Sequence, residues 1–331
     1  MRRNPELIKG RWGRWVLYVL ALAVGWPLLI NAVNSARSDN GFDLSDSLIP
    51  ADEIHHGGPT RDGIPALDNP TFIASDKADF MKPDDRVLGI ELNGQRRAYP
   101  VLILNHHEIV NDHIGRDGVV ITYCPLCGTG MAFSSLVDGE LRRFGVSGLL
   151  YNSDVLLYDR ESESLWSQLK RQAISGPLKG YRLTSIPMQH TTWADWQQGG
   201  PGLVLSKDTG HSRDYSRSPY GSYDDDEAIY FPVNARSARY HPKERVLGIG
   251  IEDVYRAYPF SELAQVDSPL RDVIDGKEIE IRFDAATRSG RIFDSSGQEL
   301  TSVNSFWFAW YAFHPETTVY KPKKVKSKKA E

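Results

Sequence analysis

The sequence predicts a strand-rich α+β fold in which two related copies of one unit flank an insert, preceded by one transmembrane helix. Three observations lead to this prediction. The segment Trp15–Val33 is apolar and carries no charge. The chain repeats two short motifs at a constant offset. Short apolar runs bounded by glycine, asparagine and aspartate are frequent, and such runs are typical of strands joined by tight turns.

Trp15–Val33 has the length of a membrane span. As a helix it would be about 28 Å long, close to the thickness of the hydrocarbon core. Basic residues crowd the preceding stretch and only Arg37 follows closely, so the positive-inside rule predicts a cytoplasmic N-terminus. We therefore expect residues 1–36 to form a basic stub and an anchor in the cytoplasmic membrane, with the body on the periplasmic or extracellular side. A signal peptide cleaved near Val33 is the alternative, and it also predicts export.

Charge is unevenly distributed along the chain. The net charge is −4, but residues 1–14 carry +4 and residues 320–331 carry +5, which leaves −13 on the body between them. An acidic body disfavours nucleic acid as a partner, because phosphate binding needs a basic face. The lysine-rich tail at 320–331 is predicted to be disordered.

The internal repeat predicts the domain organisation. Arg86–Ile90 recurs as Arg245–Ile249, and Arg97–Pro100 recurs as Arg256–Pro259, with the same offset of 159 residues. Two separate matches at one offset indicate two copies of one structural unit. The predicted organisation is a lead-in at 37–81, copy one at 82–145, an insert at 146–240 and copy two at 241–319.

Within copy one the expected elements follow from local patterns. Val87–Leu92 is an apolar strand that ends at a turn at 93–94. Pro100 suits the first turn of a helix, so a helix is expected directly after it. A turn at 115–118 leads to the strand Val119–Tyr123, and a short loop follows.

The insert is predicted to begin with strands and to contain one helix. Apolar runs at 155–158 and 165–168 surround a polar turn and predict two strands. A helix is expected to begin after Thr191 or Thr192, either of which can cap it, and to end at Gly199.

Two further segments have unusual composition. Residues 207–227 have almost no apolar periodicity and contain several tyrosines and arginines, so they predict either a segment that lines a binding cleft or a solvated loop. The aromatic run at 306–313 predicts a strand in the core.

The two cysteines of the chain stand three positions apart in Cys124-Pro125-Leu126-Cys127. This spacing allows a reversible disulfide, a thiolate pair that binds a soft metal, or a permanent local disulfide. A thioredoxin-type site would place a helix after the second cysteine, whereas residues 128–133 predict a glycine turn and a strand. A zinc ribbon would need a second pair of cysteines. The sequence therefore predicts a thiol-redox or metal site and leaves the two open.

Copy two lacks the reactive residues of copy one. Asp284 and Thr287 stand where Cys124 and Cys127 stand in copy one, and the His-His-Glu segment at 106–108 has no counterpart. Thiols and imidazoles are absent together, which suggests that they cooperate in one site.

This comparison assigns candidate roles. Cys124 and Cys127 would be the metal ligands or the redox pair. His107 would be the third ligand or the base that keeps a thiol ionised, and Glu108 would orient its imidazole. Zinc or copper would be the ion, and a thioether ligand would favour cuprous copper. The candidate metal ligands are Cys124, Cys127, His106, His107 and Met131.

Several motifs together resemble one prokaryotic family. The motifs are Tyr123–Thr129, which contains both cysteines, His107–Asp112, Leu165–Gln168, Phe306–Trp310 and His314–Thr317. Their combination resembles the family known as domain of unknown function 3179 (DUF3179), over about residues 50–320. The resemblance implies that the His-Glu and Cys-Pro-x-Cys motifs belong to one module, and it implies no particular reaction.

A non-catalytic binding module is the alternative function. In that case the cysteines form a permanent local disulfide, and the tyrosines and arginines of 207–227 recognise an acidic or aromatic ligand. A hydrolase has no nucleophile motif to support it. The sequence leaves open whether the protein is an enzyme and which protein or small molecule is its partner.

Overall fold

The computed structural model describes residues 39–322 of the chain. None of the helices within these residues is long and apolar enough to cross a membrane. The predicted transmembrane helix, and the location at the cytoplasmic membrane inferred from it, therefore have no support in the structure. Trp15–Val33, on which that prediction rests, and most of the lysine-rich tail lie outside the described residues.

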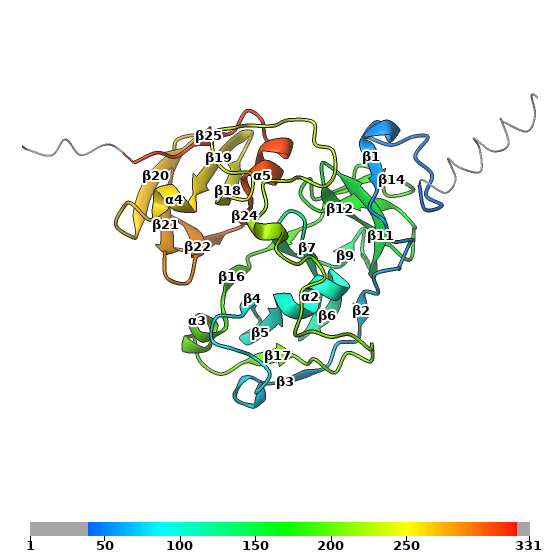
Figure 1. Cartoon of the computed structure of the whole chain (residues 1–331), viewed down its shortest axis with the longest axis horizontal. Coiled ribbons are helices and arrows are strands. Elements are labelled where there is room, and N and C mark those ends of the chain that lie inside the picture. Colours follow the sequence, from blue (N-terminus) through cyan, green and yellow to red (C-terminus); the bar gives the residue numbers. More distant parts are fainter. Residues whose placement is uncertain (1–38, 323–331) are drawn as a thin grey trace, which may run out of the picture.

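The prediction of an α+β class is wrong. The described part of the chain contains six β-sheets, of which the five larger ones are arranged as a five-bladed β-propeller (Figure 1). The chain does form α-helices, but each makes only one or two turns before the chain becomes extended again. The α-helices of residues 39–322 therefore form no layer of their own. They are α2 (Val101–His107), α3 (Trp193–Gln198), α4 (Phe260–Leu263) and α5 (Trp307–Phe313).

Two blades combine the strands of copy one at residues 86–134 with short strands of the lead-in and the insert. Blade I contains β3 (Phe72–Ala74), β4 (Arg86–Leu92), β5 (Gln95–Pro100), β16 (Gln189–Thr192) and β17 (Leu203–Leu205), in the order β16-β4-β5-β17-β3. Blade II contains β2 (Leu67–Asp68), β6 (Ile109–Ile114), β7 (Asp117–Cys124), β8 (Thr129–Ser134) and β15 (Ser185–Ile186), in the order β15-β8-β7-β6-β2. A small hairpin, β9 (Leu136–Val137) with β10 (Glu140–Leu141), follows β8.

Blade III combines one strand of the lead-in with four strands from the end of copy one and the first part of the insert. It contains β1 (Ile54–His56), β11 (Phe144–Tyr151), β12 (Asp154–Asp159), β13 (Leu165–Ser167) and β14 (Gln172–Ser175), in sequential order. The predicted strands at 155–158 and 165–168 correspond to β12 and β13. Three short 3-10 helices complete the described chain between strands: η1 (Ala51–Glu53), η2 (Ser75–Lys77) and η3 (Tyr223–Asp225).

The last two blades hold the strands of copy two. Blade IV contains β18 (Arg245–Ile251), β19 (Val254–Pro259), β24 (Val303–Phe306) and β25 (Thr318–Val319), in the order β24-β18-β19-β25. Blade V contains β20 (Leu270–Ile274), β21 (Lys277–Asp284), β22 (Ser289–Asp294) and β23 (Glu299–Leu300), in sequential order.

Strand pairing makes the repeat visible. Val87 lies opposite Pro100 in β4–β5, and Val246 lies opposite Pro259 in β18–β19, so both hairpins have one register. The correspondence continues beyond residue 145. β16 pairs with β4 as β24 pairs with β18, and β17 runs parallel to β5 as β25 runs parallel to β19. The structure therefore joins β16, α3 and β17 to copy one.

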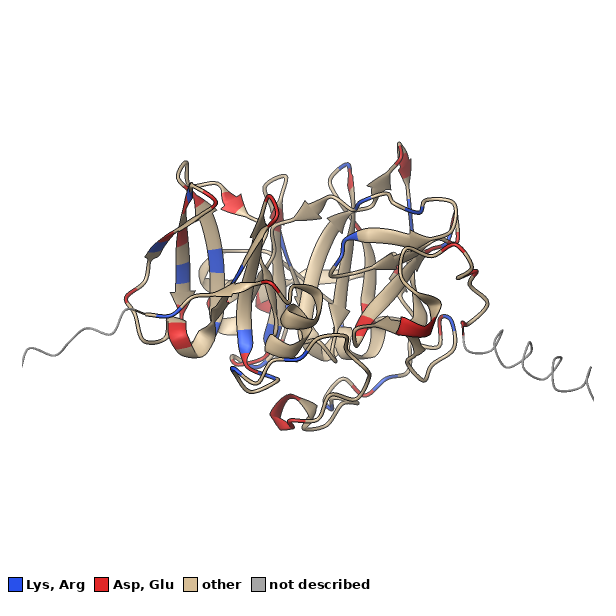
Figure 2. Cartoon of the chain, turned by 90° about the horizontal axis from the view of Figure 1, so that it is seen from above, with Lys and Arg blue, Asp and Glu red and all other residues tan. Residues whose placement is uncertain are grey.

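The two copies pack against each other through equivalent strands. β24 of copy two lies against β8 of copy one, and β16 of copy one lies against β22 of copy two. One apolar cluster, which includes Cys124, Trp166 and Trp310, joins blades II, III and IV. The cysteine hairpin thus lies in the shared core, whereas acidic and basic residues are interspersed around the blades (Figure 2).

The aromatic run at 306–313 differs from its prediction. Only Phe306 belongs to a strand, and Trp307–Phe313 forms the buried helix α5. Trp310 of this helix packs on Gly248, where any side chain would collide with the indole, and Trp196 of α3 packs on Gly89 in the same way. The helix is selected because its tryptophan fills the space above a glycine in the adjacent strand.

Candidate functional site

A tight hairpin loop holds the two cysteines. β7 ends at Cys124, β8 begins at Thr129, and these two residues lie opposite each other. The Gly128 N–H donates to the Pro125 carbonyl over 3.3 Å, and Gly128 has φ +60°, which favours glycine. Both cysteines are free thiols that are buried in the core. The permanent local disulfide of the alternative prediction is thus not formed in this structure.

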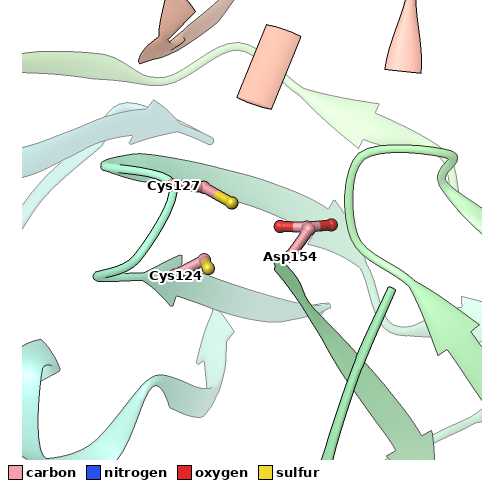
Figure 3. A group of neighbouring side chains, drawn as sticks. All are labelled: Cys124, Cys127 and Asp154. Atoms are coloured by element: carbon pink, nitrogen blue, oxygen red, sulfur yellow. The ribbon is translucent and has the colours of Figure 1, made fainter. Parts of the chain in front are cut away.

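A second hairpin, in blade III, faces the thiols. β11 and β12 are joined by Asn152 and Ser153, whose φ values of 51° and 64° are those of a type I′ turn. The Ser153 carbonyl oxygen lies 3.3 Å from Cys127 Sγ and 3.8 Å from Cys124 Sγ. The next residue, Asp154, is also buried and directs its carboxylate to the two sulfur atoms (Figure 3).

These three side chains form a compact donor group. The two sulfur atoms and one carboxylate oxygen of Asp154 all lie within 4.8 Å of one another. Asp154 Oδ2 accepts a hydrogen bond of 3.0 Å from the Leu169 N–H, whereas buried Oδ1 has no hydrogen-bond partner in the described chain. Two thiols and a carboxylate are ligand types that zinc accepts, so the group is suited to hold a metal ion.

Burial controls the protonation of the group. It raises the pKa of Cys124, and it raises that of Cys127 well above the ordinary value of a thiol. Burial also raises the pKa of Asp154 to about 7, against the opposing hydrogen bond from the Leu169 N–H. Both thiols are therefore protonated at neutral pH, which makes them weak nucleophiles until a positive charge approaches.

One positive side chain lies close to this group. Lys243 is 4% exposed, and its Nζ lies 3.4 Å from the ring centre of Tyr223. The ammonium donates to the carbonyl oxygens of Tyr223, Asp226 and Ala228. Burial lowers the pKa of Lys243, against the opposing charges of Asp226 and Asp224. These contacts hold the cation in a fixed position, 5.8 Å from the centre of the Phe306 ring that lies over the cysteine loop.

Comparison with known proteins places the chain in a family. A family model described as "Protein of unknown function (DUF3179)" matches residues 61–317. The chain belongs to the DUF3179 family. No curated protein and no solved structure matches it. Membership of this family assigns no activity, so the chemistry of the site rests on its geometry.

The predicted third ligand, His107, is engaged elsewhere. Its Nδ1 lies 2.8 Å from the Pro65 carbonyl oxygen, and its Nε2 lies 2.6 Å from the Tyr215 hydroxyl. Burial lowers the pKa of His107 to about 4, so the imidazole is neutral at physiological pH. Neither ring nitrogen belongs to the group formed by Cys124, Cys127 and Asp154.

The remaining predicted residues lie around the site. His106 Nε2 lies 3.0 Å from the Arg217 carbonyl oxygen. Glu108 is buried at the end of α2 and accepts a hydrogen bond of 3.1 Å from the Tyr220 hydroxyl; burial raises its pKa to about 7. Met131 packs in the same apolar cluster as both cysteines. The Glu108 carbonyl oxygen accepts a hydrogen bond of 2.7 Å from the Tyr123 N–H, so Glu108 lies beside the strand that ends at Cys124.

The polar segment at 207–227 folds over this region. Tyr215 and Tyr220 bond to the end of α2, and Tyr223 is buried in the apolar cluster that contains the cysteines. The segment predicted as either a cleft lining or a solvated loop is therefore a cover that is fixed by its tyrosines.

Sequence reasoning missed Asp154, Ser153 and Lys243. A polar Asn-Ser pair between two apolar runs could have indicated the hairpin that carries Asp154. Nothing in the spacing indicates that this hairpin meets the cysteine loop, because the contact joins two different blades.

Proposed function

We propose that Cys124, Cys127 and Asp154 bind a divalent metal ion, with zinc as the preferred ion. The observation that supports this most strongly is the mutual proximity of three buried donor atoms, all within 4.8 Å. Zinc bonds of about 2.0–2.3 Å in a tetrahedron place neighbouring donors roughly 3.5–3.8 Å apart, which this spacing accommodates.

The donor types favour zinc over cuprous copper. A carboxylate oxygen is a hard ligand that suits zinc, whereas cuprous copper prefers sulfur donors alone. Met131 lies in the same cluster as the cysteines and could complete a copper site only if Asp154 stayed unbound. Two thiolates, one carboxylate and one zinc ion leave one negative charge, and the ammonium of Lys243 is placed to balance it.

Three protein ligands leave one position of a tetrahedral zinc ion for water or a small ligand. This pattern is typical of catalytic zinc sites, whereas structural sites have four protein ligands. The chemistry that zinc supplies in such a site is Lewis-acid polarisation or an activated water. In such a site the ammonium of Lys243 would balance the remaining negative charge, and the tyrosine-rich segment at 207–227 would limit the access of solvent.

Dithiol redox exchange is the second candidate function. It is favoured by Asp154, whose pKa of about 7 would let its carboxylate take a proton from a neighbouring thiol. In that reaction Cys124 and Cys127 would form a disulfide while a partner disulfide is reduced to two thiols. Full burial of both sulfur atoms opposes this candidate, because the partner disulfide must reach one of them.

Elemental analysis of the purified full-length chain separates these candidates. The protein would be prepared without chelator, supplied with zinc and dialysed. We expect about one zinc per chain, and loss of that zinc in the double variant Cys124→Ser/Cys127→Ser.

The matched control is Asp284→Ser/Thr287→Ser, which changes the equivalent hairpin turn of copy two and should keep the zinc. Zinc-free protein whose two thiols oxidise reversibly to one disulfide would reject the metal site and support redox exchange.

A further inference from the structure

Two equivalent arginines bond across the interface between the copies. Arg86 of copy one donates to the carbonyl oxygens of Thr287 and Arg288, in the β21–β22 turn of copy two. Arg245 of copy two donates over 3.0 Å to the carbonyl oxygen of Gly128, in the β7–β8 turn of copy one. The exchange is reciprocal, so both guanidinium groups lie where the two copies meet.

A second equivalent pair stands beside these arginines. His190 lies opposite Leu88 in β16–β4, and Asn304 lies opposite Leu247 in β24–β18. Arg86 donates over 2.7 Å to the His190 carbonyl oxygen, and Arg245 donates over 3.4 Å to Asn304 Oδ1. Each arginine thus bonds to a polar residue on the equivalent strand of its own copy, and these four polar residues make up the interface cluster.

The cluster contains buried hydrogen-bonding atoms that no described residue satisfies. His190 is 4% exposed, and neither of its ring nitrogens has a partner in residues 39–322. Asn304 is 6% exposed, and its Nδ2 donor is equally unsatisfied there. Leaving such groups unpaired is costly, so they indicate a bound ion or water.

The charges around the cluster decide which kind of ligand fits. Among the described residues Arg86 forms no ion pair, and Arg245 has one carboxylate within 4.0 Å, that of Asp224 at 3.5 Å. Exposed Arg288 adds a third positive charge, and Asp195 adds a negative one near Arg86. Positive charge is thus in excess, and burial together with these arginines lowers the pKa of His190 well below its ordinary value, which keeps the ring neutral.

We propose that Arg86, Arg245, His190 and Asn304 bind a small oxyanion at the interface between the two copies. The guanidinium groups supply the charge, and the imidazole and amide N–H groups supply directional hydrogen bonds. Carboxylates, phosphate and sulfate share this chemistry.

The oxyanion site is separate from the thiol group. Tyr123 and Cys124 are neighbours in β7 and point to opposite faces of blade II. The Tyr123 ring lies 6.4 Å from the His190 ring, centre to centre, whereas Cys124 faces Ser153 of blade III. Failure of one proposal therefore leaves the other intact.

Isothermal titration calorimetry of the full-length chain tests the oxyanion site. Sodium phosphate, sulfate and acetate would be titrated separately at constant ionic strength, against sodium chloride as the reference. We expect saturable binding of at least one of the three oxyanions. The titration that shows binding identifies which class of oxyanion the site accepts. His190→Phe, which keeps an aromatic ring against Tyr123, and Arg245→Gln should each weaken it about tenfold or more.

The matched control is Arg116→Gln, which removes one positive charge from an exposed turn and should bind as the wild type does. The proposal is overturned if none of the oxyanions binds more than chloride does, which would assign the unpaired atoms to water, or if either variant keeps the wild-type affinity. Circular dichroism checks the fold of both variants, and His190→Phe alone decides if Arg245→Gln does not fold.

Discussion

Asp154 is the residue on which the proposed metal site most depends, because its carboxylate is the third ligand. It stands in the last position of a type I′ hairpin, where the positive φ angles of Asn152 and Ser153 fix its direction. The same turn presents the Ser153 carbonyl oxygen to both sulfur atoms. A strained and buried polar turn of this kind is expected where the chain holds a ligand.

Asp154→Asn is predicted to weaken zinc binding by at least about tenfold. The amide keeps the shape of the side chain but loses the negative charge that zinc requires of its ligand. Competition with a chromogenic chelator measures the affinity. Asp284→Asn, at the position of copy two that corresponds to Cys124, is the control, and equal affinities of Asp154→Asn and the wild type would exclude the carboxylate as a ligand.

His107 has a predicted effect on stability at low pH. Its pKa is lowered by burial from 6.5 to about 4, so the unfolded chain binds the extra proton between these values and the folded chain does not. The free energy of unfolding should therefore decrease as the pH falls from about 6.5 to about 4, and this contribution is complete above the unfolded pKa.

Urea unfolding of His107→Gln and of the wild type across this pH range measures the effect. The variant should show a shallower decrease, while His113→Gln, on the exposed side of β6, should keep the wild-type slope. Parallel curves for His107→Gln and the wild type would contradict the account.

At the scale of the element, the β7–β8 hairpin shows why copy one and copy two differ in chemistry. Gly128 and Arg288 occupy equivalent turn positions with φ of 60° and 48°. In copy one the Phe306 ring lies over the turn and leaves no room for a side chain. The two copies share the turn geometry. Only the turn of copy one is buried, and only that turn carries thiols.

Gly128→Ala is predicted to destabilise the protein by about 2–3 kcal/mol. A Cβ there would lie 2.9 Å from the buried Phe306 ring, and the positive φ adds strain. Chemical denaturation gives the free energy of unfolding. Gly139→Ala is the matched control, since it has φ +76° with nothing within 4 Å of its Cβ, and should cost about 1 kcal/mol. Equal costs for the two variants would show that the ring does not constrain the loop.

Element boundaries in copy one followed from the sequence, whereas their assembly did not. The strand at Val87–Leu92, the helix after Pro100 and the cap at Thr192 obey local rules that the structure retains. The run at 306–313 did not obey its local pattern, because packing of Trp310 on Gly248 selects a helix. The sequence could indicate that His106, His107 and Glu108 lie near the cysteines but not what they bond to, because their hydrogen-bond partners are Pro65 and residues of the segment at 207–227.

At the scale of the whole molecule, the two copies behave as one core. β24 of copy two packs on β8 of copy one, and the Phe306 N–H donates to the Cys127 carbonyl oxygen over 2.8 Å. A propeller could not be predicted from the repeat, because the contacts that place the blades join residues more than 100 positions apart, as Arg245 and Gly128 do. The sequence pattern defines strands and turns but not which sheets become neighbours.

Trp310→Ala in blade IV is predicted to expose the thiols of blade II at a lower denaturant concentration. Removing this buried indole should cost about 3–5 kcal/mol, and the shared core transmits the loss to both copies. Thiol labelling and circular dichroism should report one coincident transition. Val273→Ala, at an exposed position of blade V, should leave the midpoint almost unchanged. Thiols that stay protected while part of the circular dichroism signal is lost would show that the two copies unfold separately.

X-ray absorption spectroscopy of the zinc-loaded full-length chain tests the proposed metal site most directly. The account predicts two sulfur neighbours at about 2.3 Å and at least one oxygen neighbour at about 2.0–2.2 Å. A zinc ion surrounded only by nitrogen and oxygen neighbours would contradict it, because Cys124 and Cys127 would then not be ligands.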